Sequence, residues 1–199
     1  EAYSIKAVLL FNKVDVNDAN TKDIVKDLTT LYEGIGYQCL SISAKTGENI
    51  EAVKSLMTGK SSMFAGHSGV GKSTLVNSIE PGLNIKTKEI SDQHKQGQHT
   101  TTFAEMFDLS FEAQIIDTPG IKGFGVVDME PAELDNYFPE LFALKQSCKF
   151  NDCLHLHEPL CAVKSAIENN QVAASRYKSY TQILEGDEEH YRTDNYEPK

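Results

Sequence analysis

The sequence predicts an α/β domain built on a mostly parallel sheet, followed by a small helical domain. Apolar segments of strand length alternate with amphipathic helical segments as far as residue 117, which is typical of an α/β sheet. A glycine-rich segment at residues 66–74 lies between a short apolar strand and an amphipathic helix. After residue 131 only helical patterns remain, around a group of cysteines and histidines. We therefore expect one domain over residues 1–128 and a second over residues 129–199.

The composition supports a packed core and excludes several classes of protein. Hydrophobic residues make up 40% of the 199 residues, so wholesale disorder is not expected. No apolar run approaches the length that spans a bilayer, and no signal-peptide pattern opens the chain. The net charge of −10 argues against nonspecific nucleic-acid binding by the whole chain, although residues 86–95 are locally richer in basic side chains.

The amino-terminal part alternates strands and helices. Residues 5–11 form a nearly continuous apolar run, as in a parallel strand covered on both faces. A helix is expected over residues 18–33, ended by the glycines within residues 34–36. Residues 38–42 predict a second strand and residues 50–57 a second helix. The expected inward positions of the two helices are Ile24, Val25, Leu28 and Leu31, then Ile50, Val53, Leu56 and Met57.

The next segments predict a strand, a helix and a hairpin. Residues 62–65 form a short apolar strand, and an amphipathic helix begins at residue 74. Residues 81–102 are polar and lack periodicity, which predicts a loop. Residues 102–109 and 113–117 then predict two strands of a hairpin. Such sheets bind ligands at the carboxyl ends of their strands, where this chain carries its candidate site residues.

The glycine-rich segment matches the pattern Gly-x4-Gly-Lys-Ser/Thr of a phosphate-binding loop. Its glycines let successive N–H groups point into one concavity, and the helix that follows adds donors and the positive end of its dipole. Lys72 would reach the β- and γ-phosphates, and Ser73 would place its hydroxyl on Mg²⁺. The alternative is a glycine-rich turn that caps an ordinary helix. The segment reads Gly66-His67-Ser68-Gly69-Val70-Gly71-Lys72-Ser73-Thr74.

A second strand end carries Asp117-Thr118-Pro119-Gly120. The carboxylate of Asp117 is expected to hold Mg²⁺, often through water. Gly120 can bring an N–H close to a γ-phosphate because it has no side chain. By itself the tetrapeptide is simply a good turn sequence. Its place after the phosphate-binding loop, at the distance of a helix, a loop and a strand, favours the nucleotide interpretation.

Two further strand ends predict guanine as the base. The carboxylate of Asp15 can accept both the N1–H and the exocyclic amino group of guanine, a contact that adenine cannot match. Asn12 would brace the loops, and the aliphatic stem of Lys13 would lie along the base. Ser43-Ala44-Lys45 would offer a backbone N–H to guanine O6. Either segment alone is more typical of a loop with a helix N-cap, and only together with the phosphate-binding loop do they favour guanine. An ATPase interpretation requires another role for Asp15.

The loop Gly97-Gln98-His99-Thr100-Thr101-Thr102 lies between the phosphate-binding segment and the next strand. A switch loop must lie there to place a threonine hydroxyl on Mg²⁺ and to sense the γ-phosphate. We select Thr101 over its neighbours for this role. Threonines that simply enter a β-strand are the alternative.

Three of the four cysteines lie close together near the carboxyl end, at Cys148, Cys153 and Cys161. With one imidazole they make a four-ligand set suited to tetrahedral structural zinc in a reducing compartment. His155 and His157 compete for the fourth position, and His157 is nearer to Cys161 in the sequence. The spacing is not a common zinc-finger pattern, so three reduced cysteines are the alternative.

The remaining apolar residues of this region are expected to pack a core. Cys39 lies in an apolar strand and is expected to be a core residue. Tyr177 and Tyr180 recur at helical spacing, which favours core positions over an RNA-binding platform. The expected core positions of the helical domain are Phe138, Leu141, Phe142, Leu144, Tyr177, Tyr180 and Leu184.

The order of the motifs is unusual, because an ordinary small GTPase begins with the phosphate-binding loop. Here Asn-Lys-x-Asp and Ser-Ala-Lys come first, then the phosphate-binding loop, the switch threonines and Asp-x-x-Gly. The chain resembles a circularly permuted GTPase. With Gln98-His99-Thr100-Thr101 and Cys148-x4-Cys153-x-His155-x5-Cys161, it is similar over nearly its whole length to the bacterial ribosome small-subunit-dependent GTPases, the ribosome biogenesis GTPase A family.

This resemblance implies a GTP hydrolase of small-subunit maturation that converts Mg²⁺–GTP to GDP and phosphate and is stimulated by the small ribosomal subunit. It implies a monomeric cytoplasmic protein that contacts rRNA and holds one structural zinc through Cys148, Cys153, His155 and Cys161. Lys72 and His99 are the expected catalytic residues. His99 is the candidate for positioning the attacking water, because Ile121 follows Gly120 where many GTPases have a glutamine for this role. A loop histidine without a role, and a GTP-dependent ribosome- or RNA-binding module with incidental turnover, are the alternatives.

The family usually carries an OB-fold domain before the GTPase domain, and these residues do not encode one. We expect a truncated piece of a longer protein rather than a divergent member, because residue 1 leads almost directly into a strand and the chain lacks an initiator Met. The permuted order also makes Asp117-Thr118-Pro119-Gly120 lead straight into the helical domain. We hypothesise that a γ-phosphate-driven shift of this segment moves that domain.

Overall fold

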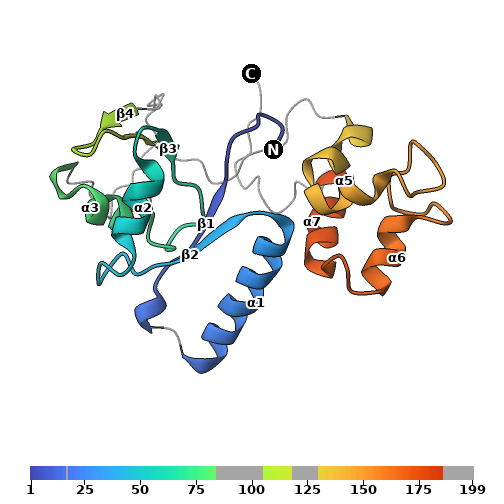
Figure 1. Cartoon of the computed structure of the whole chain (residues 1–199), viewed down its shortest axis with the longest axis horizontal. Helices are drawn as coiled ribbons and strands as arrows, with labels where there is room; N and C mark the ends of the chain where they lie inside the picture. Colours follow the sequence, from blue (N-terminus) through green and yellow to red (C-terminus); the bar gives the residue numbers. More distant parts are fainter. Residues whose placement is uncertain (17, 84–104, 118–129, 186–199) are drawn as a thin grey trace, which may run out of the picture. The chain divides into compact units, whose positions relative to one another are not determined.

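The computed structural model describes residues 1–16, 18–83, 105–117 and 130–185 (Figure 1). The chain divides into two compact units. The predicted boundary near residue 128 falls within residues 118–129, outside the described part, and stays a prediction. One unit comprises Val8–Thr30 and Tyr37–Phe124, and the other comprises Glu1–Ala7, Leu31–Gly36 and Gly125–Lys199.

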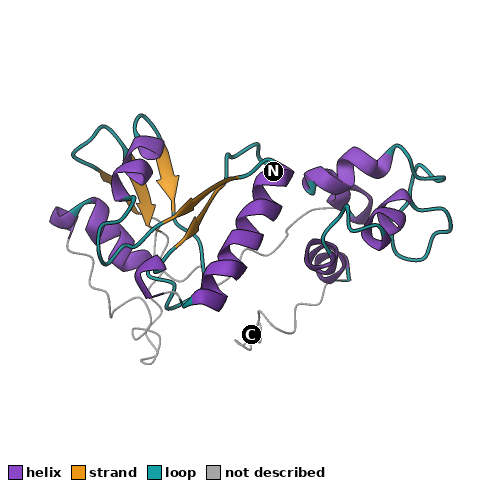
Figure 2. Cartoon of the chain, turned by 60° about the horizontal axis from the view of Figure 1, so that its bottom comes forward, coloured by secondary structure: helices purple, strands orange, loops and turns teal. Residues whose placement is uncertain are grey.

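The strands of the first unit form two hydrogen-bonded sheets (Figure 2). β1 (Val8–Phe11) pairs in parallel with β2 (Gln38–Ser41). β5 (Gln114–Asp117) lies between β3 (Ser61–Met63), to which it is parallel, and β4 (Glu105–Asp108), to which it is antiparallel. The predicted parallel pairs and the hairpin are therefore present, but no single continuous ladder joins these five described strands.

β1 is shorter than the apolar run predicts. It begins at Val8, which pairs with Gln38, the first residue of β2. The preceding residues have no β2 residue opposite them in this register, and Ile5 is accordingly 72% exposed. Strand length is thus set by the partner strand, which local hydrophobicity does not reveal.

The two sheets share one hydrophobic core. Leu10 and Leu40 from the first sheet and Phe107 from the second pack against the same buried cluster. α2 (Ile50–Met57) and α3 (Lys72–Ile79) supply most of the buried side chains of this core. This shared core positions the loops that follow the strands. Its buried residues include Ile42, Val53, Met57, Leu75, Val76, Ile79 and Ile115.

α1 (Ala19–Ile35) begins at an aspartate cap. The Thr21 N–H donates to Asp18 Oδ1 at 2.8 Å, and this hydrogen bond lowers the pKa of Asp18. The helix passes through Gly34 and ends at Ile35, just before Gly36, whose φ of 111° only glycine adopts readily. Gly36 therefore stops the helix and Gly34 does not. Ile24 is 50% exposed, so the expectation that it points inward is wrong.

The described residues of the second unit beyond residue 130 contain only helical elements, as predicted. They are η4 (Pro131–Tyr137), α5 (Pro139–Lys145), α6 (Ala162–Glu168) and α7 (Ala174–Leu184). In the part of the chain that the structure describes, no helix is long and apolar enough to cross a membrane. The described residues also contain two short 3₁₀ turns, η1 (Val14–Val16) and η2 (Pro81–Leu83).

A second core holds these helices together around the cysteine loop. Phe138, Leu141 and Tyr180 are buried, and the ring of Phe138 meets that of Tyr180 edge-on at 5.5 Å. Leu144, Tyr177 and Leu184 pack against them, as expected. Phe142 is 53% exposed instead, and Cys39 in β2 is only partly buried.

Candidate nucleotide-binding site and metal centre

The phosphate-binding segment follows β3 and leads into α3. Gly69 and Gly71 have φ values of 83° and 97°, and Gly71 is the residue from which α3 starts. Lys72 Nζ donates to the carbonyl of His67 at 2.9 Å and to that of Gly66. Strand, curled loop and helix therefore form as predicted, with the ammonium group drawn over the loop.

The side chain of Asn12 joins three loops. Its Nδ2 donates to the carbonyl of Val70 at 2.9 Å, in the phosphate-binding loop. Its Oδ1 accepts from the N–H of Ala44 at 3.0 Å and from the N–H of Lys13 at 2.8 Å. One amide thus ties the ends of β1, β2 and β3 together, which is the bracing that the sequence predicts.

Lys13 binds the same loop as Asn12. Its Nζ donates to the carbonyl of Gly69 at 2.7 Å. Across each trans peptide the carbonyl and the following N–H point in opposite directions. Because the carbonyls of Gly69 and Val70 face this segment, the N–H groups of Val70 and Gly71 face away from it. Two donors are thereby oriented on the other side of the loop.

Asp15 and Ser43 meet across the β1 and β2 loops. Ser43 Oγ, which is fully buried, donates to Asp15 Oδ1 at 2.6 Å and accepts from the N–H of Thr46 at 3.2 Å. Asp15 itself is exposed, so its oriented carboxylate remains accessible to a ligand. Lys45 is likewise exposed. The arrangement suits recognition of a base that offers two neighbouring donors.

Several predicted site residues fall outside the described part of the chain. His99, Thr101 and Gly120 lie there, so their predicted roles stay predictions. Asp117 ends β5, and its side chain is not described. The parallel register of Met63 with Ile116 nevertheless brings the ends of β3 and β5 to the same edge of the sheet. Asp117 therefore lies at the edge from which the phosphate-binding loop leaves.

Four potential metal ligands converge in the helical unit. One atom from each of Cys148, Cys153, His155 and Cys161 lies within 4.8 Å of the others. His155 Nδ1 is 3.3 Å from Cys161 Sγ and 3.7 Å from Cys148 Sγ. Three of the four residues are buried, and His157 is exposed. The structure thus brings His155 to the cysteines, and three sulfurs with one nitrogen suit a tetrahedral metal ion.

Burial disfavours the thiolate forms that a metal ion requires. It raises the pKa of the Cys153 thiol to about 12 and raises the pKa of Cys161 as well. A divalent cation favours deprotonated thiols and so offsets this cost. Without a cation these two side chains are therefore protonated thiols at neutral pH, and metal binding has to release their protons.

Side chains outside the cysteine loop hold it in shape. The hydroxyl of Tyr177 donates to the carbonyl of His155 at 2.6 Å, and that of Tyr180 to the carbonyl of Leu154 at 3.0 Å. On the other side of the imidazole, His155 Nε2 lies 3.2 Å from Asp135 Oδ2. Sequence reasoning missed Asp135. Its only signal is an acidic residue beside Leu134 in a segment whose apolar residues face the core.

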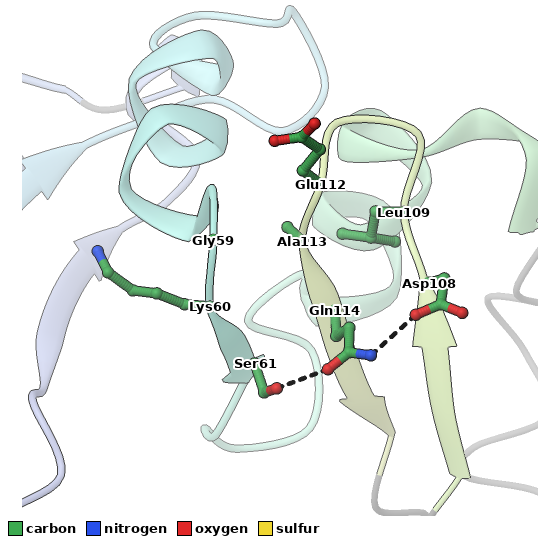
Figure 3. Close-up of a pocket in the computed structure, with 8 residues that line it drawn as sticks. All are labelled: Gly59, Lys60, Ser61, Asp108, Leu109, Glu112, Ala113 and Gln114. Atoms are coloured by element: carbon green, nitrogen blue, oxygen red, sulfur yellow. Dashed lines mark hydrogen bonds between the residues drawn. The ribbon is translucent and has the colours of Figure 1, made fainter.

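A pocket of about 330 Å³ lies at the amino-terminal ends of β3 and β5 (Figure 3). Ser61 Oγ donates to Gln114 Oε1 at 2.8 Å, and Gln114 Nε2 donates to Asp108 Oδ1 at 2.9 Å. The nucleotide loops follow the carboxyl ends of the strands, so this pocket lies at the opposite end. None of the predicted site residues lines it.

The fold and the joined loops define a GTPase-type domain with circularly permuted motifs and a Cys₃His cluster behind them. The model of the RsgA GTPase family matches residues 1–127, and the chain belongs to this family. The predicted family and fold class are thereby confirmed.

Relatives and solved structures agree with this assignment. Proteins named small ribosomal subunit biogenesis GTPase RsgA are 62% identical over 196 residues in Flavobacterium johnsoniae and 51% identical over 189 residues in Bacteroides fragilis. The matches cover 98% and 95% of this chain, and 60% and 61% of those relatives. The chain therefore spans about three fifths of the length of these relatives.

Two crystal structures have the same fold. YjeQ from Thermotoga maritima matches with a TM-score of 0.77 and 39% identity over 92% of this chain and 60% of that protein. YloQ, described as a circularly permuted GTPase, matches with a TM-score of 0.72 and 30% identity over 94% of this chain and 58% of that protein. Both likenesses extend beyond the GTPase-type unit into the helical one, since each covers more than nine tenths of the chain.

Proposed function

We propose that this chain is the GTP-hydrolysing part of a factor for small ribosomal subunit maturation. It binds Mg²⁺–GTP, hydrolyses it to GDP and phosphate, and is stimulated by the small ribosomal subunit. The observation that carries the proposal is the side chain of Asn12, which joins the phosphate-binding loop to the two loops predicted to read guanine. The names of the relatives supply the subunit.

The geometry supports a division of labour for nucleotide binding. The N–H groups of the curled loop and the ammonium of Lys72 bind the phosphates. Asp15, oriented by Ser43, binds guanine. Mg²⁺, which the GTPase family implies, would neutralise phosphate charge and would be held by Ser73, Thr101 and Asp117. The proposed GTP-binding residues are Asn12, Lys13, Asp15, Ser43, Ala44, Lys45, Gly66, His67, Ser68, Gly69, Val70, Gly71, Lys72, Ser73, Thr74 and Gly120.

Hydrolysis is an in-line attack of water on the γ-phosphate. Lys72 stabilises the charge that builds up on the phosphoryl oxygens. His99 orients the water or carries its proton, because Ile121 occupies the usual glutamine position. Positioning without the full set of groups leaves most of the barrier in place, so intrinsic turnover is slow until a partner completes the site.

The role of His99 is open to a direct test. His99→Ala is expected to keep the affinity for a fluorescent GTP analogue and to lose most of the subunit-stimulated turnover, because only the attacking water loses its partner. Phosphate release under multiple turnover measures the effect. Replacement of His157, an exposed histidine of the helical unit, is the matched control and should change neither quantity. Unaltered stimulated turnover in His99→Ala would end the proposal for this residue.

We further propose that the Cys₃His cluster holds a single structural zinc ion. Four protein ligands leave no open position for a substrate, so the ion would fold the loop between α5 and α6 rather than catalyse. Reduced cysteines of this kind suit a reducing compartment. We therefore propose a cytoplasmic protein. We also propose that it acts as a monomer and contacts the rRNA of the small subunit.

Turnover of GTP and of ATP, each with and without purified small ribosomal subunits, tests the function. GTP-selective turnover that rises with subunits supports the proposal and shows that this chain suffices for stimulation. Selective GTP binding with turnover unmoved by subunits contradicts it for this chain. Repeating the measurement with a longer relative then separates a requirement for further residues from a GTP-dependent binding module.

A further inference from the structure

Asp135 is a buried carboxylate that bridges two groups in the helical unit. Only 2% of the residue is exposed. Its Oδ1 lies 2.7 Å from Lys145 Nζ, and its Oδ2 lies 3.2 Å from His155 Nε2. The ammonium of Lys145 also donates to the carbonyl of Ala132 and to Asn136 Oδ1, both at 3.2 Å. Lys145 therefore points all three of its donors into η4.

These contacts determine which imidazole nitrogen carries the proton. Lys145 can only donate, so Asp135 Oδ1 accepts from its ammonium group. A carboxylate oxygen beside Nε2 of His155 requires that nitrogen to be the donor. In a neutral imidazole Nδ1 is then unprotonated, and Nδ1 is the atom that faces the sulfurs of Cys148 and Cys161. The nitrogen with the free lone pair is thus the one among the sulfurs.

We propose that Asp135 is a positioning residue of the metal centre. It selects the Nε2–H tautomer of His155 and so presents Nδ1 to the ion, while Lys145 holds the carboxylate in place from η4. The inference rests on the metal site proposed above. Carboxylate partners of this kind alter metal affinity by about 10- to 100-fold when they are removed.

Replacement by the isosteric amide would set the two contacts against each other. An asparagine at this position has one oxygen and one NH₂ group. If its oxygen faces His155, its NH₂ group opposes the ammonium of Lys145. If its oxygen faces Lys145, its NH₂ group donates to Nε2 and forces the proton onto Nδ1, which then cannot bind a metal ion. Asp135→Asn is therefore expected to weaken zinc binding by about 10- to 100-fold.

A pair of double variants isolates the acceptor from the ion pair. In Asp135→Asn/Lys145→Met the amide oxygen can turn to His155 unopposed, and zinc affinity is expected to return to within about threefold of wild type. Asp135→Leu/Lys145→Met removes the same charges but offers Nε2 no acceptor, so its affinity should stay about 10- to 100-fold low. If Asp135 only neutralised Lys145, the two double variants would have equal zinc affinity.

The measurement is competition of the full chain with a chromophoric chelator for zinc, with circular dichroism as a check of folding. Glu140→Gln is the control, because it breaks another ion pair of the helical unit, with Arg176, and should leave zinc affinity unchanged. A second readout is the Nε2–H proton of zinc-loaded His155 in NMR spectra, expected to be slowly exchanging in the wild type and the Asn double variant and lost in the Leu one.

The outcomes separate this inference from the proposed metal site. A wild-type chain that takes up no zinc overturns both. Stoichiometric uptake by the wild type with equal affinity of the two double variants overturns the positioning role alone. If the Leu variant does not fold, Asp135→Asn decides, and wild-type affinity in that variant overturns the inference.

Discussion

Gly71 combines a left-handed backbone with close contact to another loop. Its φ is 97°, and a Cβ atom there would lie 2.5 Å from Asn12 Nδ2. Gly71→Ala is therefore expected to lower the free energy of unfolding by about 1–2 kcal/mol and to weaken GTP binding, because the methyl group displaces the amide that joins the loops. Urea denaturation and titration with a fluorescent GTP analogue measure the two effects.

Gly34 provides the matched control. It lies within α1, and a Cβ atom there would meet nothing within 4 Å. Gly34→Ala is expected to raise the free energy of unfolding by about 0.5–1 kcal/mol, since alanine restricts the unfolded chain more than glycine does. Equal stability of the two variants would show that Gly71 carries no special constraint.

Asp15 is the residue on which base selectivity depends in the proposed site. Asp15→Asn replaces one carboxylate oxygen by an NH₂ group, which suits the C2 carbonyl of xanthine and opposes the C2 amino group of guanine. We expect an affinity loss of about 100-fold or more for GTP and a gain for XTP. Displacement of a bound fluorescent analogue by GTP and by XTP measures the two affinities. Unchanged preference for GTP would assign guanine recognition to other residues.

At the scale of the element, the cysteine loop is shaped by a carboxylate as well as by its metal ligands. Glu158 Oε1 accepts from the N–H of Leu154 at 2.9 Å, and its Oε2 accepts from those of Leu156 and His157 at 2.9 and 3.1 Å. Burial raises the pKa of Glu158, but these hydrogen bonds together outweigh it and leave the pKa below 4.5. The loop that carries His155 is thus fixed from within.

Glu158→Gln is expected to lower the free energy of unfolding by about 1–2 kcal/mol at pH 7, because an amide cannot accept all three N–H groups. The pKa of Glu158 in the folded chain is lower than its unfolded value of 4.5. The carboxylate therefore stabilises the folded chain fully above pH 4.5, and this stabilisation is lost as the pH falls through the folded pKa. The difference from wild type should therefore shrink on acidification.

Thermal unfolding of both chains between pH 3 and 7, roughly the range over which carboxylates titrate, measures this dependence. Glu168→Gln removes the same charge from an exposed position at the end of α6 and should change stability little. A difference between Glu158→Gln and wild type that stays constant across this range would show that the hydrogen bonds do not depend on ionisation.

At the scale of the whole molecule, β5 leads through residues 118–129 to η4. These residues include Gly120, which is predicted to meet the γ-phosphate. We expect a non-hydrolysable GTP analogue and GDP to give measurably different solution-scattering distance distributions, because the switch and the helical unit share this connection. Asp15→Asn, which should bind neither nucleotide well, is the control. Identical scattering with both nucleotides would contradict the coupling.

The short motifs and the alternation of elements could be predicted because they are local. Phosphate-binding loop, Asn-Lys-x-Asp and the cysteine spacing each lie within one short segment, and helical or strand periodicity needs only neighbouring residues. Burial at the edges of this pattern could not be predicted. Ile24 and Phe142 are apolar residues of α1 and α5, yet they are 50% and 53% exposed. Burial depends on which other elements pack against a helix, and neighbouring residues in the sequence do not reveal this.

The sequence by itself determined the type of domain, the predicted nucleotide and metal ligands, and the permuted order of the motifs. Only the tertiary structure decided which of these residues meet. Asn12 reaches Val70 across 58 positions of the chain, and Asp135 reaches His155 across 20. The physical reason is that the chemistry of a side chain determines which hydrogen bonds it can make, whereas the packing of strands and helices determines which partner lies within hydrogen-bonding distance.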